Sequence, residues 1–497
     1  MIIISCLPVI ALLSPLIGGI IAYQAGKISE TARDLISIVA AIVSFIVIVA
    51  MVPTILNGNT IEYSFYYTAI STLPIAFRVG PFPLFLGLVI SFAWILSAVY
   101  SHRYMERLHS RNRFCLFMSL TLSAVIGTLF AKNMFALFIF FEITLFTSYV
   151  LVIHEETPEA MAAGKKYLFL GLATGLVMFF GILLVYLQVG TLDLGKRGIL
   201  DGVHGNILYV ILFTLLVGAL FKAGMFPLHV WLHSAHPIAP SPASAVLSGV
   251  VVKEGCYVMI RILYDIFGVN LLKTMLVSNW LVLLGGLSIF FGSAMAIRQH
   301  DLKTMLAYST VSKVGYIFLG AALLTPTGLQ GAMVQIFHHL LAKSALFFCA
   351  GALIYKAGIR DIDQMAGIGK KMPITMMVFT IAALSMIGVP PLVGFASKWY
   401  IVLGALEAGR PLAIGFGLVL MLSSLMNAIY FIPIIINAFF TGESEHGEHK
   451  EVRPDDVPLS MAVPMVILAI GIIVFGVLSA TTSVVVIKPT VNAMMGL

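Results

Sequence analysis

The sequence predicts an all-α polytopic membrane protein with about 14 transmembrane helices. Hydrophobic residues make up 60% of the 497 positions and charged residues only 10%, and the mean hydropathy is +1.04. Apolar runs of about 20 residues, the length that crosses a bilayer, recur along nearly the whole chain. A soluble protein could not cover so much apolar surface, and a transmembrane barrel would show short alternating strands instead.

The apolar segments begin with MIIISCLPVIALLSPLIGG. This segment has no basic stretch before it and no small-residue cleavage site after it, so we interpret it as a retained span and not as a signal peptide. The predicted spans lie near residues 2–23, 34–56, 79–100, 113–131, 133–153, 164–188, 206–235 (broken), 241–264, 276–297, 302–322, 330–355, 374–404 (broken), 413–440 and 459–485.

Lysine and arginine are distributed unevenly between alternate loops. With the N-terminus placed outside, the loops assigned to the inside carry about twice as many of them as the loops assigned to the outside. The positive-inside rule therefore predicts a multi-pass protein of the cell membrane with both termini outside. It also predicts that the loop HRYMERLHSRNR and the polar stretch GESEHGEHKEVRPDD face the cytoplasm together.

Several charged or titratable residues fall inside the predicted spans. A charge at the bilayer centre costs about 2.5–3.5 kcal/mol on insertion scales, so each such residue needs a partner or a function. Burial lowers the pKa of an amine towards neutral pH, so lysine can serve as a proton station where arginine cannot. The residues concerned are Glu142, Lys222, Lys253, Glu254, Lys313, His338, His339, Lys343 and Lys398.

Two of the predicted spans are interrupted by proline. Pro227 breaks the span that carries Lys222, and Pro390 with Pro391 breaks the span that carries Lys398. Proline frees carbonyl groups inside the membrane, which is tolerated where protein or water receives them. The second break comes five spans after the first, so the two units would have opposite topology. Interrupted helices in two halves predict an inverted-repeat transporter with its ion path at the breaks.

The sequence offers no cofactor site. The cysteines stand singly in apolar segments, without a CxxC or Cys/His cluster, so any redox centre is expected in partner subunits. No Walker or dinucleotide-binding motif is present, and cytoplasmic basic loops explain the +7 net charge without nucleic acid. The spacing of His229, His233 and His236 could suit a metal. The prolines that follow them favour a polar lining at the cytoplasmic mouth instead, and we expect no metal.

Five motifs carry a family resemblance: FEITLFTSY around Glu142, LFKAGMFPLHVWLHSAHPIAPSPASAVLSGVVVKEGCY, DLKTMLAYSTVSKVGY, HHLLAKSALFFCAG and GVPPLVGFASKW. With these motifs the chain resembles, over about its whole length, the antiporter-like membrane subunits of three kinds of complex. These are respiratory complex I, the ferredoxin-driven membrane-bound hydrogenase type, and Mrp-type sodium/proton antiporters, where the likeness is to Mrp D. The resemblance implies other membrane subunits, some of them related antiporter-like subunits, as partners within the lipid bilayer.

The family fold implies two inverted five-helix repeats with broken seventh and twelfth helices. The repeats would occupy residues 113–265 and 276–440, after a three-helix segment at 1–112. A cytoplasmic loop at 441–458 and a C-terminal helix at 459–497 would follow.

The resemblance also assigns roles to the buried charges. It implies ion translocation by Glu142, Lys222, Lys253 and Lys398, with His339 and Lys343 as candidates for the station of the eleventh helix. We take Glu142 as the switchable partner of Lys222; a static ion pair is the structural alternative. Possible further contributors are His338, Lys313, Glu254 and His229. Many relatives have glutamine where Lys313 stands, and Glu254 adds an acid beside the central lysine.

Three functions remain compatible with the sequence. The first is a proton- or sodium-translocating member of a redox-driven complex of the hydrogenase/complex I type, without a catalytic centre of its own. The second is a member of an Mrp-type secondary antiporter. The third is a membrane scaffold whose buried charges are static. The sequence leaves open which ion moves, in what stoichiometry, and which electron donor and acceptor the complex uses.

Overall fold

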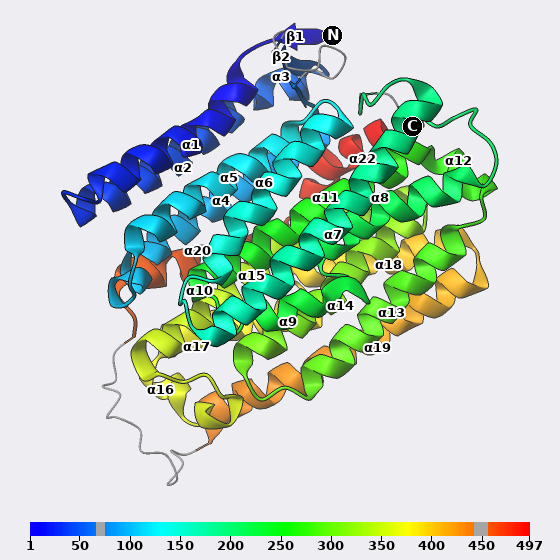
Figure 1. The fold of residues 1–497 in the computed structure, drawn as a ribbon. Helices are drawn as coiled ribbons and strands as arrows, with labels where there is room; N and C mark the ends of the chain where they lie inside the picture. The colour runs from blue at the N-terminus through cyan, green and yellow to red at the C-terminus, as the bar shows by residue number, and fades with distance from the viewer. Residues whose placement is uncertain (66–74, 196, 442–455) are drawn as a thin grey trace.

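Long helices that share one common direction form nearly the whole molecule (Figure 1). The computed structural model describes residues 1–65, 75–195, 197–441 and 456–497. Within these residues, eleven helices are long and apolar enough to cross a membrane. The chain is therefore an all-α polytopic membrane protein, as the sequence predicts.

The N-terminal part and the first predicted repeat comprise α1 Leu7–Ala25, α2 Glu30–Ala50, α3 Val52–Leu56, α4 Pro81–Tyr104, η1 Met105–Arg107, α5 Arg111–Phe130, α6 Met134–Val152, α7 Pro158–Val189, α8 Ile207–Ala223, η2 Leu228–Trp231, α9 Leu232–Ala235, α10 Ser241–Val246, η3 Leu247–Val251, α11 Val252–Arg261, η4 Ile262–Phe267 and α12 Gly268–Thr274. The second repeat and the C-terminal part comprise α13 Ser278–Ile297, α14 Leu302–Ala322, α15 Pro326–Ala357, η5 Ile362–Met365, α16 Ile368–Lys371, α17 Pro373–Ile387, α18 Val393–Ala408, α19 Pro411–Phe440, α20 Leu459–Val477, α21 Ser479–Thr482, η6 Ser483–Ile487 and α22 Lys488–Met495.

Three predicted spans are helical but do not count among the eleven apolar helices. They are the segment from α10 to η4, helix α14, and the pair α17 and α18. These helices carry Lys253, Lys313 and Lys398, and almost every side chain of α11 and α14 is buried. Helix α14 is enclosed by other helices and does not need to be uniformly apolar. In the segment from α10 to η4, π-helical stretches divide the span into short pieces, and α17 (15 residues) and α18 (16 residues) are short because their span is broken between them.

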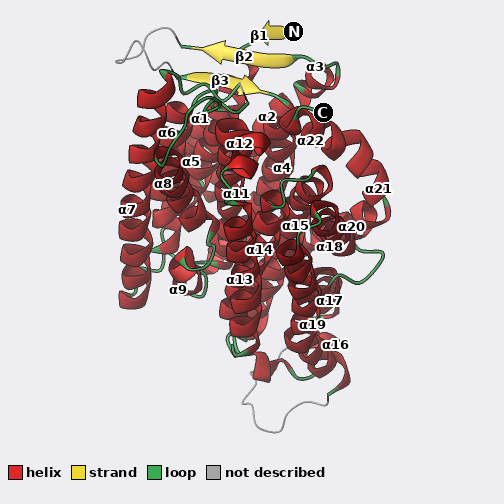
Figure 2. Cartoon of the chain, turned by 90° about the vertical axis from the view of Figure 1, so that its right-hand side faces the viewer, coloured by secondary structure: helices red, strands yellow, loops and turns green. Residues whose placement is uncertain are grey.

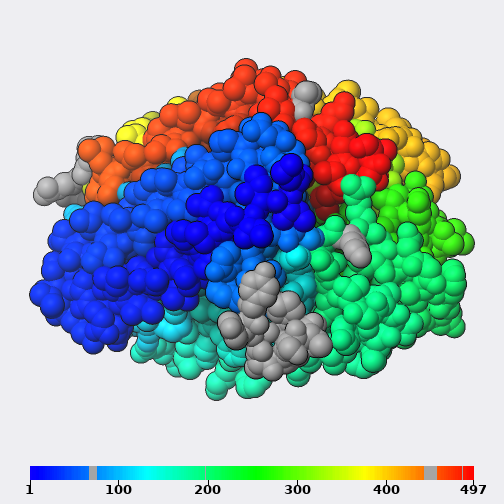
Figure 3. All heavy atoms as spheres, turned by 90° about the horizontal axis from the view of Figure 1, so that it is seen from above, coloured from blue at the N-terminus to red at the C-terminus, as the bar shows by residue number. Residues whose placement is uncertain are grey.

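The structure contains a small sheet that the sequence analysis does not predict. Strand β2 (Thr60–Ser64) pairs in parallel with β1 (Ile2–Ile4) and antiparallel with β3 (Ala76–Val79). The predicted first span therefore begins as a strand, because the β-branched run of isoleucines favours extended backbone, and its helix begins only at Leu7. The sheet and both chain termini lie at one end of the bundle (Figure 2), and the N-terminal and C-terminal segments both appear on that face in Figure 3.

The two broken helices end at glycines that precede the prolines. Helix α8 stops at Gly224 (φ 68°) and α17 stops at Gly388 (φ 96°), both in the left-handed region that glycine adopts without strain. Pro227, Pro390 and Pro391 lie in the turns that follow. The sequence thus locates the breaks, but a glycine ends each helix and the prolines prevent its continuation.

The two halves repeat the same local architecture. Helices α7 and α15 each have 32 residues, begin with a Thr-Pro cap, and end at a left-handed glycine. The N-cap residue of α6, Asn133, forms a β-bridge with Asp193, and the N-cap residue of α14, Asp301, forms one with Asp361. The same caps, helix lengths and β-bridges occur in the same order in both halves, which supports a duplicated five-helix unit. The boundaries of the repeats remain a prediction.

The described parts of the two segments predicted to share a side lie at the same end of the bundle. Arg103 and Arg107, within the loop HRYMERLHSRNR, line one groove together with Asp456. Residues 442–455, including His446 and His449, lie outside the described residues. Which end faces the cytoplasm is not tested by the fold and stays a prediction.

The turn after α6 contains a histidine that makes stability sensitive to acid. His154 is buried beside Arg113 and stacks on His109, and mainly its burial lowers its pKa to about 4. The unfolded histidine takes up its proton near pH 6.5, so the unfolded chain binds more protons below that pH. We expect thermal stability in detergent to fall by at most about 3 kcal/mol as the pH drops from 7 towards 4. The His154→Gln variant should lose most of this pH dependence; an unchanged dependence would contradict the assignment.

Candidate functional site

The amine of Lys222 lies at the end of α8, where the first helix break begins. Its Nζ is 3.4 Å from Oε2 of Glu254, lies 3.5 Å above the ring centre of Phe141, and donates to the Phe141 carbonyl. Both charged side chains are almost completely buried. A lysine in the last turn of a helix also interacts favourably with the negative end of the helix dipole. The break therefore carries a buried ion pair.

Glu254 is the ion-pair partner of Lys222, where the sequence analysis predicts Glu142. Its Oε1 accepts hydrogen bonds from Thr128 (2.6 Å) and Thr144 (3.0 Å), which hold the carboxylate in place. The pair forms because α11 approaches α8 closely at Gly255, where a Cβ would lie 2.3 Å from the backbone nitrogen of Ala223. Such an approach depends on helix packing that the spacing of charges along the sequence does not show.

Glu142 lies on α6 at the edge of this site. Its side chain is half-buried and packs against α7 at Gly175, where a Cβ would lie 2.4 Å from Oε1. Its charge interacts with those of Lys222 and Glu254. Glu142 is therefore close enough to influence the pair electrostatically, while Glu254 makes the direct contact.

Lys253 occupies the centre of the bundle, next to a local change of helix type. The segment Leu247–Val251 is π-helical, and Nζ of Lys253 donates to the carbonyl of Ser248 at 2.5 Å. The hydroxyls of Ser248 and Thr310 are 2.9 Å apart, so a hydrogen bond joins the π-helical segment to α14. A π-bulge releases backbone groups from the regular helix pattern and is frequent at functional sites.

The eleventh predicted span, α15, brings further titratable groups to the same interior. Lys343 donates to the Leu306 carbonyl at 2.6 Å and to the Ser309 hydroxyl. His338 Nδ1 lies 3.2 Å from Oε1 of Gln335. Neither ring nitrogen of His339 has a hydrogen-bond partner among the described residues. Lys343 and both histidines are fully buried.

Lys313 on α14 is fully buried, and its amine has no hydrogen-bond partner in the described part of the chain. It lies 4.1 Å from the ring centre of Tyr316, whose hydroxyl donates to Ser423 at 3.0 Å. Its charge interacts with those of Lys398 and Lys343. The amine of Lys398 lies 5.7 Å from the centre of the same ring, so Tyr316 adjoins both lysines.

Lys398 on α18 caps the second helix break. Its amine donates to the carbonyls of Met386 (3.1 Å) and Ile387, the last residues of α17, and to the hydroxyl of Ser424 at 2.8 Å. Carbonyls at the end of a helix lack intrahelical partners, and a cation there satisfies them. Lys398 thus caps the second break, whereas Lys222 stands in the last helical turn before the first break.

The interior holds more amines than carboxylates. Among the described residues, Lys253, Lys313, Lys343 and Lys398 have no carboxylate within ion-pair distance, and carbonyls, hydroxyls or aromatic faces surround them. A buried charge without a counter-charge is costly. Such a set is poorly suited to static stabilisation and well suited to transient charging.

The histidines predicted to line the mouth have neighbours that the sequence analysis does not identify. The ring of His229 lies 6.1 Å from that of His233, which stacks on Tyr308 at 5.1 Å. His236 is fully buried and has no partner for either ring nitrogen among the described residues. Lys303, near the start of α14, is 3% exposed and donates to the Ala239 carbonyl at 2.5 Å.

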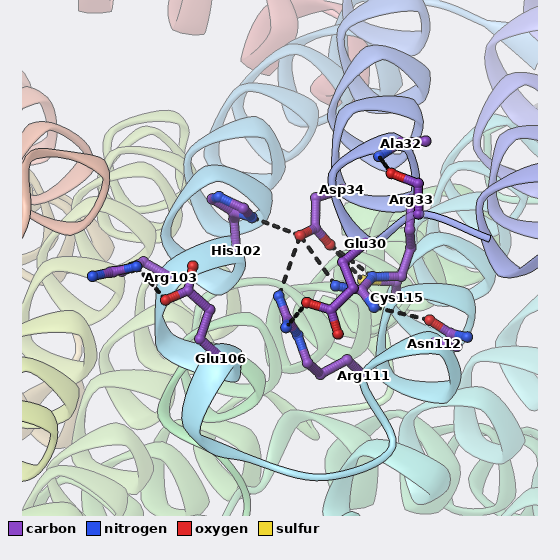
Figure 4. Close-up of polar contacts among 11 residues, drawn as sticks. Glu30, Ala32, Arg33, Asp34, His102, Arg103, Glu106, Arg111, Asn112 and Cys115 are labelled. Carbon is purple, nitrogen blue, oxygen red and sulfur yellow. Dashed lines mark hydrogen bonds and ion pairs between the residues drawn. The ribbon is translucent and has the colours of Figure 1, made fainter. Parts of the chain in front are cut away.

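A second polar cluster lies away from this line, between α2, α4 and α5 (Figure 4). Asp34 accepts two bonds from Arg33, at 2.8 and 3.1 Å, and lies 2.6 Å from His102 and 3.4 Å from Arg111. Arg111 also pairs with Glu30, so two acids face two arginines, and these contacts join three helices. The sequence does not predict this cluster, because nothing along the chain indicates that Arg33 and Arg111 meet.

The chain is similar to known membrane proteins. Residues 131–424 match the family model described as NADH:quinone oxidoreductase/Mrp antiporter, transmembrane region. The N-type subunit of the NADH-quinone oxidoreductase of Desulforudis audaxviator is 35% identical over 86% of this chain and 87% of that protein. The D-type subunit of the Na(+)/H(+) antiporter of Alkalihalophilus pseudofirmus is 29% identical over 85% of this chain and 86% of that protein.

Solved structures agree with this similarity. A chain of the membrane-bound sulfane sulfur reductase, an archaeal respiratory membrane complex, superposes with a TM-score of 0.87 at 25% identity, covering 99% of this chain and 98% of that one. The matched region 131–424 contains both helix breaks and the five interior lysines, which are Lys222, Lys253, Lys313, Lys343 and Lys398.

Proposed function

The chain belongs to the NADH:quinone oxidoreductase/Mrp antiporter family of transmembrane proteins, and from this premise we propose that it translocates protons or sodium ions within a multisubunit, redox-driven membrane complex of the hydrogenase/complex I type. One observation carries the proposal: the five interior lysine amines lie between and at the two helix breaks. A membrane interior retains such residues where they serve transport.

The first step takes place at the Lys222–Glu254 pair. While the pair is closed, the carboxylate stabilises the charged amine; when it opens, the amine loses that stabilisation and its proton can move on. Glu142 acts on both members through its charge. The helix ends after Ala223, so Lys222 stands in a terminal turn, where a change of backbone conformation can open the pair without breaking a continuous helix.

The charge then passes along the interior from one amine to the next. Charge–charge interactions couple Lys343 to Lys253, and Lys313 to Lys343 and Lys398. His339 and Lys313 offer buried nitrogens without partners among the described residues, and buried polar groups of this kind are normally satisfied by water. This arrangement supports a hydrated path that runs across the bundle from the first break to the second.

The complex supplies the redox chemistry. Electron transfer would occur on centres held by partner proteins, and related antiporter-like proteins would lie beside this one in the cell membrane. The basic loops at the end opposite the sheet support a cytoplasmic position for that end, with both termini outside. The proton stations of this chain would then respond to rearrangements in its neighbours.

The second candidate function is membership of an Mrp-type sodium/proton antiporter. A sodium/proton antiporter protein is similar over 85% of this chain, and this similarity supports the second candidate function. The two functions share the path described above and differ only in what drives it. A passive scaffold does not explain why four of the buried amines lack a neighbouring carboxylate in the part of the chain that the structure describes.

Uptake of ions by vesicles that contain the whole purified complex distinguishes these functions. We expect an electron donor and acceptor pair to drive uptake of protons or sodium, with the electron carriers identified by mass spectrometry as components of the complex. Uptake driven only by an imposed sodium or proton gradient, without any electron carrier in the purified complex, would favour the secondary antiporter. If neither the electron donor and acceptor pair nor an imposed gradient drove ion uptake, the result would favour the scaffold function.

A further inference from the structure

A pocket lies at the end of the bundle opposite the sheet, beside the turn at residues 237–240 that joins α9 to α10. We call it the turn pocket; it encloses roughly 900 Å³, including space open to solvent. Its walls come from the end of α4, the start of α7, this turn, the start of α14 and the end of α15. It is separate from the groove that Arg103 lines, because the two share no lining residue.

The rim of the turn pocket carries charged groups of both signs. Glu159 is exposed in the first turn of α7, and Glu155 is half-buried in the turn before that helix. Arg360 also lines the pocket, where it donates to the Pro237 carbonyl at 2.8 Å and pairs with Asp301 at 3.5 Å. Charged groups retain water around them, so the rim is a place where protons can be exchanged with water.

The amine of Lys303 forms the floor of the turn pocket. The side chain is almost completely buried, and Nζ donates to the Ala239 carbonyl at 2.5 Å. Its charge interacts with those of Glu155 and Asp301 at the rim. A buried lysine amine can release and regain a proton, whereas its positive charge repels a metal cation. The floor therefore suits protons and not sodium ions.

His236 immediately precedes the turn and connects the floor of the pocket with the interior of the bundle. It is fully buried, and neither of its ring nitrogens has a hydrogen-bond partner among the described residues. Its charge interacts with those of Lys303, Lys343 and Lys253. Buried nitrogens of this kind are normally satisfied by water. The surroundings of His236 thus support a hydrated link from Lys303 to two of the interior lysines.

Helix α14 brings the floor of the pocket close to the same lysines. Lys303 lies in its first turn, and the carbonyl of Leu306, three residues later, accepts a hydrogen bond from Lys343 at 2.6 Å. Three residues of α-helix correspond to a rise of about 4.5 Å along the axis. The first buried amine below the rim is therefore about one helical turn from a carbonyl that holds an interior amine.

We propose that the turn pocket is the entrance through which protons from the end opposite the sheet reach Lys253 and Lys343, with Lys303 as the first station and His236 as the link. Lys303 binds a proton from water in the pocket, passes it through His236 to an interior amine that has released its own, and returns to its neutral form. The inference rests on the proposed function and adds to it a supply of protons that does not pass through the Lys222–Glu254 pair.

The first test closes the pocket without changing a charged residue. Ile238, in the lining, is replaced by cysteine, and the matched control is Ile374→Cys, at the same end of the bundle but outside the pocket. Both variants and the parent also carry Cys6→Ser and Cys115→Ser, because these two cysteines are not fully buried. Each purified complex is treated with a methanethiosulfonate reagent that attaches a sulfonate, and is then reconstituted into vesicles for measurement of proton flux.

We expect treatment to lower the flux of Ile238→Cys severalfold relative to the identically treated parent, and a thiol reductant to restore it. The control should remain like the parent at equal labelling, as measured by mass spectrometry. Unchanged flux in the fully labelled Ile238→Cys complex would overturn the proposal, and so would a cysteine at this position that the reagent cannot reach. Absence of flux in the untreated parent would instead contradict the proposed function itself.

A second test separates a proton station at Lys303 from a structural cap of the turn. Lys303→Arg keeps a positive charge and donors for the Ala239 carbonyl, but arginine does not release its proton. We expect a severalfold lower flux at equal content of the assembled complex, and parent-like flux in the control Lys165→Arg, an exposed position outside the pocket. Parent-like flux in Lys303→Arg would show that Lys303 only caps the turn, and would overturn its role as the first station.

Discussion

Substitution of Glu254 by glutamine is expected to reduce ion flux through the complex to background. Glutamine keeps the shape of the side chain and can still accept hydrogen bonds from Thr128 and Thr144, but it removes the charge that faces Lys222 at 3.4 Å. Removing one partner of a buried pair also destabilises a protein by about 3–5 kcal/mol. Flux must therefore be measured in vesicles at equal content of the assembled complex.

A double variant separates transport from stability. In Lys222→Met with Glu254→Gln, neither charge remains, so the energetic cost of an unpaired charge disappears and assembly should recover. If the pair is part of the path, flux stays at background in the recovered complex. Recovery of flux together with assembly would show that the pair is structural.

Glu142→Gln provides the comparison within the same site. Because Glu142 is half-buried and Glu254 makes the direct ion pair with Lys222, neutralising Glu142 should slow the flux and leave a measurable part of it. A complete loss in Glu142→Gln, with full flux in Glu254→Gln, would instead identify Glu142 as the functional partner.

Lys398→Ala is expected to abolish flux as well, at the opposite end of the path. The substitution removes the amine that satisfies the Met386 and Ile387 carbonyls at the second break. Lys398→Arg keeps a positive charge and several donors, but arginine does not release its proton. We therefore expect the arginine variant to assemble better than the alanine variant and to transport no better.

The control for both Lys398 variants is Arg298→Ala, an exposed position outside the path. Flux measured in the same vesicles should equal that of the parent. Parent-like flux in Lys398→Arg would mean that a permanent charge suffices at this place, and that Lys398 is not a proton station.

The general fold can be predicted because it depends mainly on the hydrophobicity of consecutive residues, which the sequence shows directly. Apolar runs long enough to cross a bilayer appear along most of the chain, and the Pro227 and Pro390–Pro391 interruptions mark both breaks. The strand Ile2–Ile4 escapes prediction because its isoleucines continue the apolar run of the following helix, and β-branching alone is too weak a preference to mark the boundary. The sheet forms through pairing with Thr60–Ser64, which the sequence does not show.

The members of the candidate site can be predicted more easily than their contacts. A lysine in an apolar run stands out, so Lys222, Lys253 and Lys398 are found from their surroundings alone. The partner of Lys222 depends on how closely α11 approaches α8, which Gly255 permits. His236 is buried because the turn before α10 folds against α15 and its ring stacks on Phe347. This contact lies between distant parts of the chain, so the sequence alone predicts only a residue that lines the mouth.

Ion flux by the complex carrying Lys253→Ala is the most direct test of the central claim, because this residue lies in the middle of the proposed path. The variant loses the hydrogen bond to the Ser248 carbonyl and removes a buried charge that has no carboxylate beside it in the described structure. We expect it to insert and assemble like the parent and to carry no proton or sodium flux above that of empty vesicles. Flux equal to that of the parent, at equal protein content, would contradict a path along the buried lysines.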